Sequence, residues 1–140
     1  MLEPAEWEFW DTWVRAQRLL TRELDRGLQR DCGISKAEFS VLMTLTGPMR
    51  VGELADALDW EKSRVAHLLT RMENRGLVAR IEDGATGRRT GIEPTAEGRR
   101  TAENAVRAHG ANIRRLVLDR LTPEQAAAIK AWSEQLTGQS

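Results

Sequence analysis

The stretch "VGELADALDWEKSRVAHLLTRMENRG", residues 51–76, decides the fold. Its first half predicts a short helix that breaks at Asp59 and Trp60. Its second half predicts a helix over residues 61–74, because apolar residues recur there at helical spacing, and Gly76 is expected to close it as a left-handed C-terminal cap. These residues are Val65, Leu68, Leu69 and Met72. A short helix, a tight turn and a second amphipathic helix together predict a helix-turn-helix, whose second helix can lie in the DNA major groove.

The next residues predict a β-hairpin. "LVARIE" (77–82) is a short β-like run, and "RTGIE" (89–93) is long enough to return antiparallel to it. A hairpin directly after a recognition helix is a wing, and this one would carry Arg88 and Arg89 near its tip. A guanidinium group there can enter a narrow minor groove. The alternative is a charged tip that only discourages aggregation through the strand edges.

The outward face of the helix over 61–74 favours contact with double-stranded DNA. At about 100° per residue, Ser63, His67, Thr70 and Asn74 lie opposite the apolar stripe, with Arg64 and Arg71 on one flank. The whole chain has 21 basic and 21 acidic residues, but residues 61–100 have nine basic against six acidic. Positive charge is therefore concentrated around this helix. The alternative is a polar face that is merely solvated.

The flanking sequence is predicted to be helical. A long helix with a Trp-rich start covers residues 6–30, and Ser35 with Glu38 forms a capping box for a helix over 36–46. Thr95 caps a helix that extends to about Leu121, and "TPEQ" (122–125) begins a last helix that ends near Leu136. The chain is thus expected to be one mainly α domain, 1–140, with a small β-hairpin.

Residues 51–98 resemble the winged helix-turn-helix core of the MarR family of bacterial transcription regulators. The resemblance rests on "L-x-x-x-L" before the turn, "S-x-x-x-x-x-L-x-R-M-E-x-R-G-L-V-x-R" through the recognition helix and first strand, and "T-x-E-G" after the wing. The flanking helices match in number and length. The resemblance implies a winged helix-turn-helix over 35–95 and dimerisation helices over 1–34 and 96–140.

The family implies a homodimeric, ligand-responsive repressor that binds a pseudo-palindromic operator. Carried over by position, Ser63, Arg64 and His67 would contact bases, Arg71 a phosphate, and Arg88 the minor groove, with Arg89 beside it. The family's orienting Asp two residues before the wing arginine is replaced by Thr86. Helix starts attract anions, so Lys36 and Arg50 are further candidates for the DNA backbone.

The aromatic residues of the terminal helices predict a subunit interface, with intrachain packing as the alternative. The family commonly binds small amphipathic or phenolic effectors, for which Trp10, Trp13 and Arg15 would offer an aromatic wall and a cation. Cys32 leaves open a thiol-redox-switched repressor, although an inert thiol is favoured. A helical interaction protein that does not bind DNA is the other alternative.

Other classes of function lack a sequence signal. There is no phosphate loop, nucleophile elbow or catalytic carboxylate pair, so no enzyme activity is expected. Two histidines and one cysteine give no framework for a metal site, and no cofactor is expected. The acidic N-terminus is unlike a signal peptide, and no segment approaches a membrane span. The sequence therefore predicts a cytoplasmic protein without a membrane partner.

Overall fold

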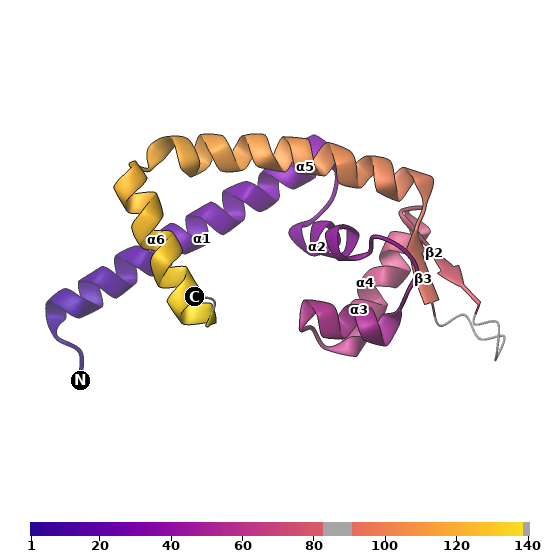
Figure 1. Ribbon diagram of the computed structural model, residues 1–140, viewed down its shortest axis with the longest axis horizontal. Helices are drawn as coiled ribbons and strands as arrows, with labels where there is room; N and C mark the ends of the chain where they lie inside the picture. The colour runs from indigo at the N-terminus through magenta and orange to yellow at the C-terminus, as the bar shows by residue number, and fades with distance from the viewer. Residues whose placement is uncertain (83–90, 139–140) are drawn as a thin grey trace. The chain divides into compact units, whose positions relative to one another are not determined.

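The fold is mainly helical, as the sequence predicts (Figure 1). The computed structural model describes residues 1–82 and 91–138. In chain order its elements are α1 (Pro4–Cys32), α2 (Lys36–Thr44), β1 (Met49–Arg50), α3 (Val51–Leu58), α4 (Lys62–Asn74), β2 (Val78–Ile81), β3 (Gly91–Pro94), α5 (Ala96–Leu116), the 3₁₀ helix η1 (Leu118–Arg120) and α6 (Pro123–Thr137). The predicted helices are all present, with ends that shift by a few residues.

The chain forms two compact units. One consists of Met1–Leu24 and His109–Ser140, and the other of Asp25–Ala108. We call them the terminal-helix unit and the winged unit. The prediction of one domain over 1–140 stays a prediction.

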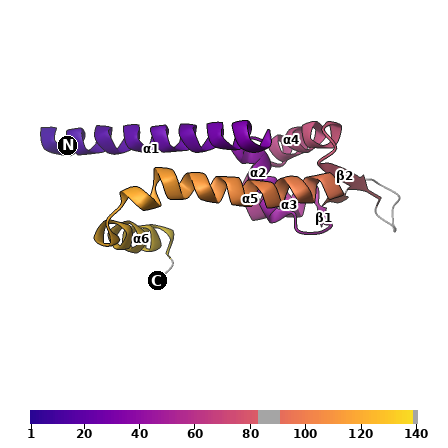
Figure 2. The same cartoon turned by 90° about the horizontal axis from the view of Figure 1, so that it is seen from above.

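The winged unit holds the core. Its largest fully buried side chains come from most elements of this unit: Leu28, Ile34, Val41, Leu45, Leu54, Val65, Leu69, Met72, Val78 and Ile92. Helix α4 packs against both α3 and β2 (Figures 1 and 2). Its apolar stripe is buried. Burial of that stripe fixes which face of α4 is left to solvent.

The sheet has three strands in the order β1-β3-β2, where the sequence predicted only a two-stranded hairpin. Strand β2 pairs antiparallel with β3, and β1 adds the pairs Met49–Ile92 and Arg50–Gly91. Strand β1 has two residues, too few to show an alternation of apolar and polar side chains. It forms through a pairing distant in sequence, which periodicity cannot reveal.

Both helices of the helix-turn-helix are followed by a left-handed residue at their C-terminal ends. Gly76 has φ of +75°, its N–H donates to the Glu73 carbonyl and the Leu77 N–H donates to the Met72 carbonyl. This is a Schellman motif, as predicted for Gly76. Asp59 ends α3 with φ of +55°, the one positive value among the described non-glycine residues. The turn from α3 to α4 therefore contains only residues 59–61.

A close approach between backbones joins α4, β2 and α5. The Thr95 hydroxyl donates to the Gly76 carbonyl (2.6 Å) and accepts from the Gly98 N–H (3.0 Å), while the Thr95 N–H donates to the Leu77 carbonyl (3.1 Å). A Cβ on Gly98 would lie 2.0 Å from that carbonyl oxygen. The Gly of the "T-x-E-G" motif is thus required by space.

Helix α5 is shorter than predicted, ending at Leu116 rather than near Leu121. The 3₁₀ helix η1 follows, and Thr122 is extended before Pro123. A residue before proline avoids the helical region, and the last turn of a helix often tightens into 3₁₀ form. The capping box of Thr122 and Gln125 is present, as predicted.

Candidate nucleic-acid interface

The predicted base-contacting residues are all exposed on α4. Val65, Leu68, Leu69 and Met72 are buried. The opposite side and its flank are exposed, with Ser63, Arg64, His67, Thr70, Arg71 and Asn74. The helical wheel drawn from sequence therefore describes the true orientation of α4. The contacts of these residues with bases or phosphates stay predictions.

Two of these side chains have local partners just before the helix. The Ser63 hydroxyl donates to the Glu61 carboxylate at 3.0 Å. The Arg64 guanidinium lies over the Trp60 ring, 4.4 Å from its centroid. Residues of the turn thus contact two exposed side chains in the first turn of α4.

A cationic groove lies along the other flank of α4. It encloses about 550 Å³ and is lined by Arg50, Val51, Gly52, Glu53, Lys62, Ala66 and Arg80. Three cations from β1, α4 and β2 meet there with the first residues of α3. Glu53 offsets part of this charge, and its carboxylate accepts the Arg50 N–H at 3.1 Å. The outward face of α4 therefore has positive charge on both sides.

Sequence reasoning identified Arg50 in this groove but missed Lys62 and Arg80. Lys62 lies one residue before the predicted base-reading positions, and Arg80 lies in a strand. Arg80 is held at the groove by Glu73 (3.5 Å) and the Thr70 hydroxyl (3.3 Å). The spacing of Lys62 and Ala66, one helical turn apart, indicates a shared face, but the contribution of Arg80 depends on the tertiary fold.

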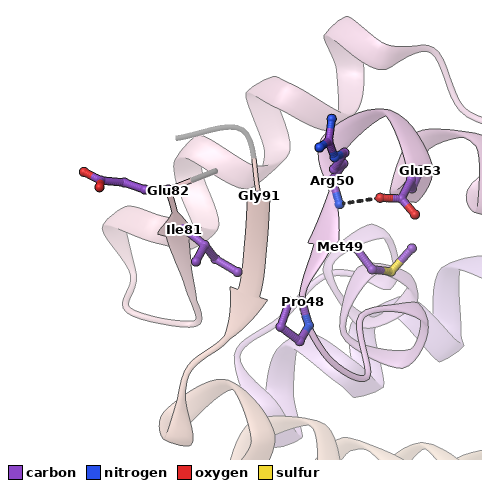
Figure 3. Close-up of a pocket in the computed structure, with 7 residues that line it drawn as sticks. All are labelled: Pro48, Met49, Arg50, Glu53, Ile81, Glu82 and Gly91. Atoms are coloured by element: carbon purple, nitrogen blue, oxygen red, sulfur yellow. Dashed lines mark hydrogen bonds between the residues drawn. The ribbon is translucent and has the colours of Figure 1, made fainter. Parts of the chain in front are cut away.

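A second, smaller pocket lies where β1 meets the wing (Figure 3). It encloses about 280 Å³ between Pro48, Met49, Arg50, Glu53, Ile81, Glu82 and Gly91. The Ile81 side chain points toward Gly91, and the Arg50 guanidinium points away from Met49 (Figure 3). The predicted wing arginines, Arg88 and Arg89, lie outside the described residues, as does Thr86.

The start of α2 is a poorer anion site than the sequence suggests. The Lys36 N–H donates to the Asp25 carboxylate at 2.8 Å, and the Ser35 and Glu38 N–H groups are bound within the capping box. The Lys36 ammonium lies 5.4 Å from the centroid of the Phe39 ring. The Ser35, Lys36 and Glu38 N–H groups are thus already bonded within the protein, and the side-chain charge of Lys36 is the stronger attraction left for a phosphate.

The predicted effector residues line two pockets of the terminal-helix unit. Trp10 and Trp13 line an apolar one of about 490 Å³ with Phe9, Ala128, Ile129 and Trp132. Trp13 and Trp132 meet edge to face there, with centroids 6.3 Å apart. Arg15 lines a different pocket, which it shares with Trp10. Trp10 is thus the only residue that lines both the aromatic pocket and the pocket that contains Arg15.

The environment of Cys32 disfavours a redox switch. Burial raises the pKa of the Cys32 thiol above its ordinary value, and the neighbouring Asp31 carboxylate raises it further. The thiolate is the reactive form, so a raised pKa slows reaction with peroxide and alkylating agents near neutral pH.

We therefore expect iodoacetamide to alkylate Cys32 more slowly in the folded protein than in the chain unfolded by guanidinium, near pH 7. The difference should shrink as the pH rises through the ordinary thiol pKa toward the raised one, because the folded protein then also forms thiolate. Mass spectrometry at timed intervals measures both rates on the chain's only cysteine. Equal or faster alkylation of the folded protein would revive the redox alternative.

The described part of the chain has neither a metal-binding cluster nor a membrane-spanning helix. Within residues 1–82 and 91–138, no cluster of three His, Cys, Asp or Glu side chains could hold a metal ion. In the same part of the chain, no helix has the length and apolar character needed to cross a membrane.

Comparison with known proteins places the chain among transcriptional regulators. Residues 28–95 match the profile of the TrmB family, described as sugar-specific transcriptional regulators. The transcriptional regulator HosA of Escherichia coli is 32% identical over 94 residues, which are 66% of this chain and 69% of that protein.

Two solved structures match almost the whole chain. The MarR family transcriptional regulator AbsC of Streptomyces coelicolor is 34% identical, with 99% of each chain covered and a TM-score of 0.79. Sco3205, a MarR family regulator of the same organism solved in complex with DNA, is 30% identical over 98% of this chain and 88% of its own, with a TM-score of 0.84. The chain therefore belongs to the MarR family of DNA-binding transcriptional regulators.

Proposed function

We propose that this protein is a cytoplasmic, homodimeric repressor that binds a pseudo-palindromic operator through α4 and the wing. The observation that carries the proposal is the exposed face of α4 between two cationic flanks. A major groove admits one helix, with base edges at its floor and phosphates along both rims. The positive charges on both flanks of α4 would lie near these phosphates. Ser63, Arg64 and His67 would then face the base edges.

The cationic groove is proposed to hold a backbone phosphate. Backbone N–H groups at the start of α3 and the cations Arg50, Lys62 and Arg80 would surround it. Such contacts fix the position of the protein on DNA without reading sequence. Arg71 would hold a phosphate on the opposite rim, and Arg88 would enter the minor groove beside the wing.

The association constant K for DNA falls as the salt concentration rises. Lys62→Ala is expected to make the plot of log K against log salt concentration less steep by about 1, because one phosphate contact releases about one counterion. The loss of affinity should be similar for specific and unrelated duplexes. Fluorescence anisotropy over a salt series measures both. Lys130→Ala removes the same charge from an exposed pair with Glu134 on α6 and serves as the control. An unchanged slope for Lys62→Ala would remove this residue from the phosphate site.

Exposed apolar side chains of the terminal-helix unit support the homodimer. Those about half exposed or more include Trp7, Phe9, Trp10, Trp132 and Leu136. A contiguous exposed apolar patch marks an interaction surface, and two copies of the chain would cover it. The apolar pocket with Trp10 and Trp13 is the proposed place of a phenolic or amphipathic effector, with Arg15 close to its anionic group.

The test of the function is enrichment of fragmented genomic DNA by the full-length protein, followed by sequencing. Enrichment of fragments that share a pseudo-palindromic sequence, with affinity that falls as salt rises, supports the proposal. Sedimentation of the protein alone tests the dimer. No shared sequence, or binding that is insensitive to salt, would favour the helical interaction protein instead.

A further inference from the structure

The turn before α4 places an aromatic ring under one arginine of the recognition helix. The Arg64 guanidinium lies 4.4 Å from the centroid of the Trp60 ring. Trp60 comes two residues before Lys62, the first residue of α4, and Arg64 follows Trp60 by four. Trp60 lies outside the helix, so its ring reaches the arginine from the turn that leads into α4.

The Trp60 ring is itself held in place. Its backbone N–H donates to the Ala55 carbonyl at 3.0 Å, within the turn that Asp59 closes. The half-buried side chain packs against the hydrophobic core of the winged unit. The ring is therefore a fixed surface, whereas an arginine on an exposed helix face would otherwise sample many rotamers.

We propose that Trp60 is a positioning residue that sets the direction of the Arg64 guanidinium and thereby the base preference of α4. A guanidinium group is planar, and its N–H donors point outward in that plane. When the flat face of the group lies over an aromatic ring, these donors remain exposed. Those donors stay available for the O6 and N7 atoms of a guanine. Stacking thus fixes the group without using the hydrogen bonds that read a base.

Arg71 offers a matched comparison on the same flank of α4. It lies seven residues after Arg64, about 10.5 Å along the helix axis at 1.5 Å per residue. That separation takes it away from the Trp60 ring. If Trp60 acts through Arg64, loss of the ring changes what Arg64 does and leaves the contribution of Arg71 intact.

The inference rests on the proposed function, so its test begins with a duplex that the wild-type protein enriches from genomic DNA. Failure to obtain such a duplex counts against the proposed function. With the duplex in hand, affinities are measured for Trp60→Leu, Arg64→Ala and the double variant, on the duplex and on a set with single base-pair changes. Thermal unfolding followed by circular dichroism confirms that each variant is folded.

Trp60→Leu is expected to weaken binding about 3- to 10-fold, the cost of ordering a side chain that is free before binding. It should also flatten the preference at the base pairs where Arg64→Ala flattens it. In an Arg64→Ala background, Trp60→Leu should change affinity less than 2-fold, whereas in an Arg71→Ala background its effect should persist. Trp60→Phe, which keeps an aromatic face, should recover part of the preference.

Three results would overturn the proposal. One is an effect of Trp60→Leu that is the same with and without Arg64, because the ring would then act independently of this arginine. Another is an equal loss on every duplex, which indicates a contact with the DNA backbone. The third is a preference that Trp60→Leu leaves intact while Arg64→Ala removes it.

Discussion

Replacement of Gly98 by alanine is expected to lower the midpoint of thermal unfolding by roughly 10 °C. The added Cβ would lie 2.0 Å from the Leu77 carbonyl oxygen, which is backbone and cannot swing aside. The start of α5 must then move away from the chain between α4 and β2. Overpacking of this kind costs about 3 kcal/mol, more than the gain that alanine normally brings to a helix.

The same substitution at Gly110 provides the control. Gly110 also lies within α5, but among the described residues no neighbouring atom lies within 4 Å of a Cβ at this position. Gly110→Ala should therefore stabilise the protein by up to about 1 kcal/mol. Thermal unfolding of both variants, followed by circular dichroism, measures the two changes in stability. Changes of the same sign and size would mean that Gly98 is not confined by Leu77.

Glu38→Ala is expected to cost about 2 to 3 kcal/mol of unfolding free energy. The Glu38 carboxylate is buried, accepts the Ser35 N–H at 2.8 Å and pairs with the Arg75 guanidinium at 2.5 Å. Arg75 in turn donates to the Gly33 carbonyl. The substitution leaves these donors without their acceptor, while the partial exposure of Arg75 limits the loss.

An exposed ion pair gives the comparison. Glu97 pairs with Arg100 at 2.7 Å within α5, and both side chains are more than half exposed. Glu97→Ala should change the unfolding free energy by less than about 0.5 kcal/mol. Chemical denaturation with urea compares the two variants. If Glu38→Ala costs no more than Glu97→Ala, the Glu38 and Arg75 cluster does not hold α2 to the end of α4.

The sequence predicts those features of the fold that depend on interactions between neighbouring residues. The apolar stripe of α4, the capping boxes at Ser35 and Thr122, and the left-handed Gly76 all depend on residues within one or two helical turns, and all are present in the structure. The exposed positions Ser63, Arg64 and His67 follow from the stripe, because burial of one face leaves the opposite face outside.

What the sequence does not predict depends on contacts between distant segments. Strand β1 requires β3, and the cationic groove gains Arg80 only because β2 packs beside α4. The contact of Arg64 with Trp60 is short in sequence, but the residues of the turn predict only a break between helices. Its geometry depends on the positive φ of Asp59, which a residue pattern does not reveal.

The three-residue turn from α3 to α4 also limits how such a regulator can acquire a new target. An inserted residue would disturb the hydrogen bonds that the Asp59 and Trp60 N–H groups donate to the Asp56 and Ala55 carbonyls, and these bonds set the path of the chain into α4. A change in the length of this turn therefore costs stability before it can change a base contact. Substitution at the exposed positions of α4 remains open, because none of them contributes to the buried stripe. Divergence among duplicated copies would thus proceed by exchange of side chains on a backbone of constant length.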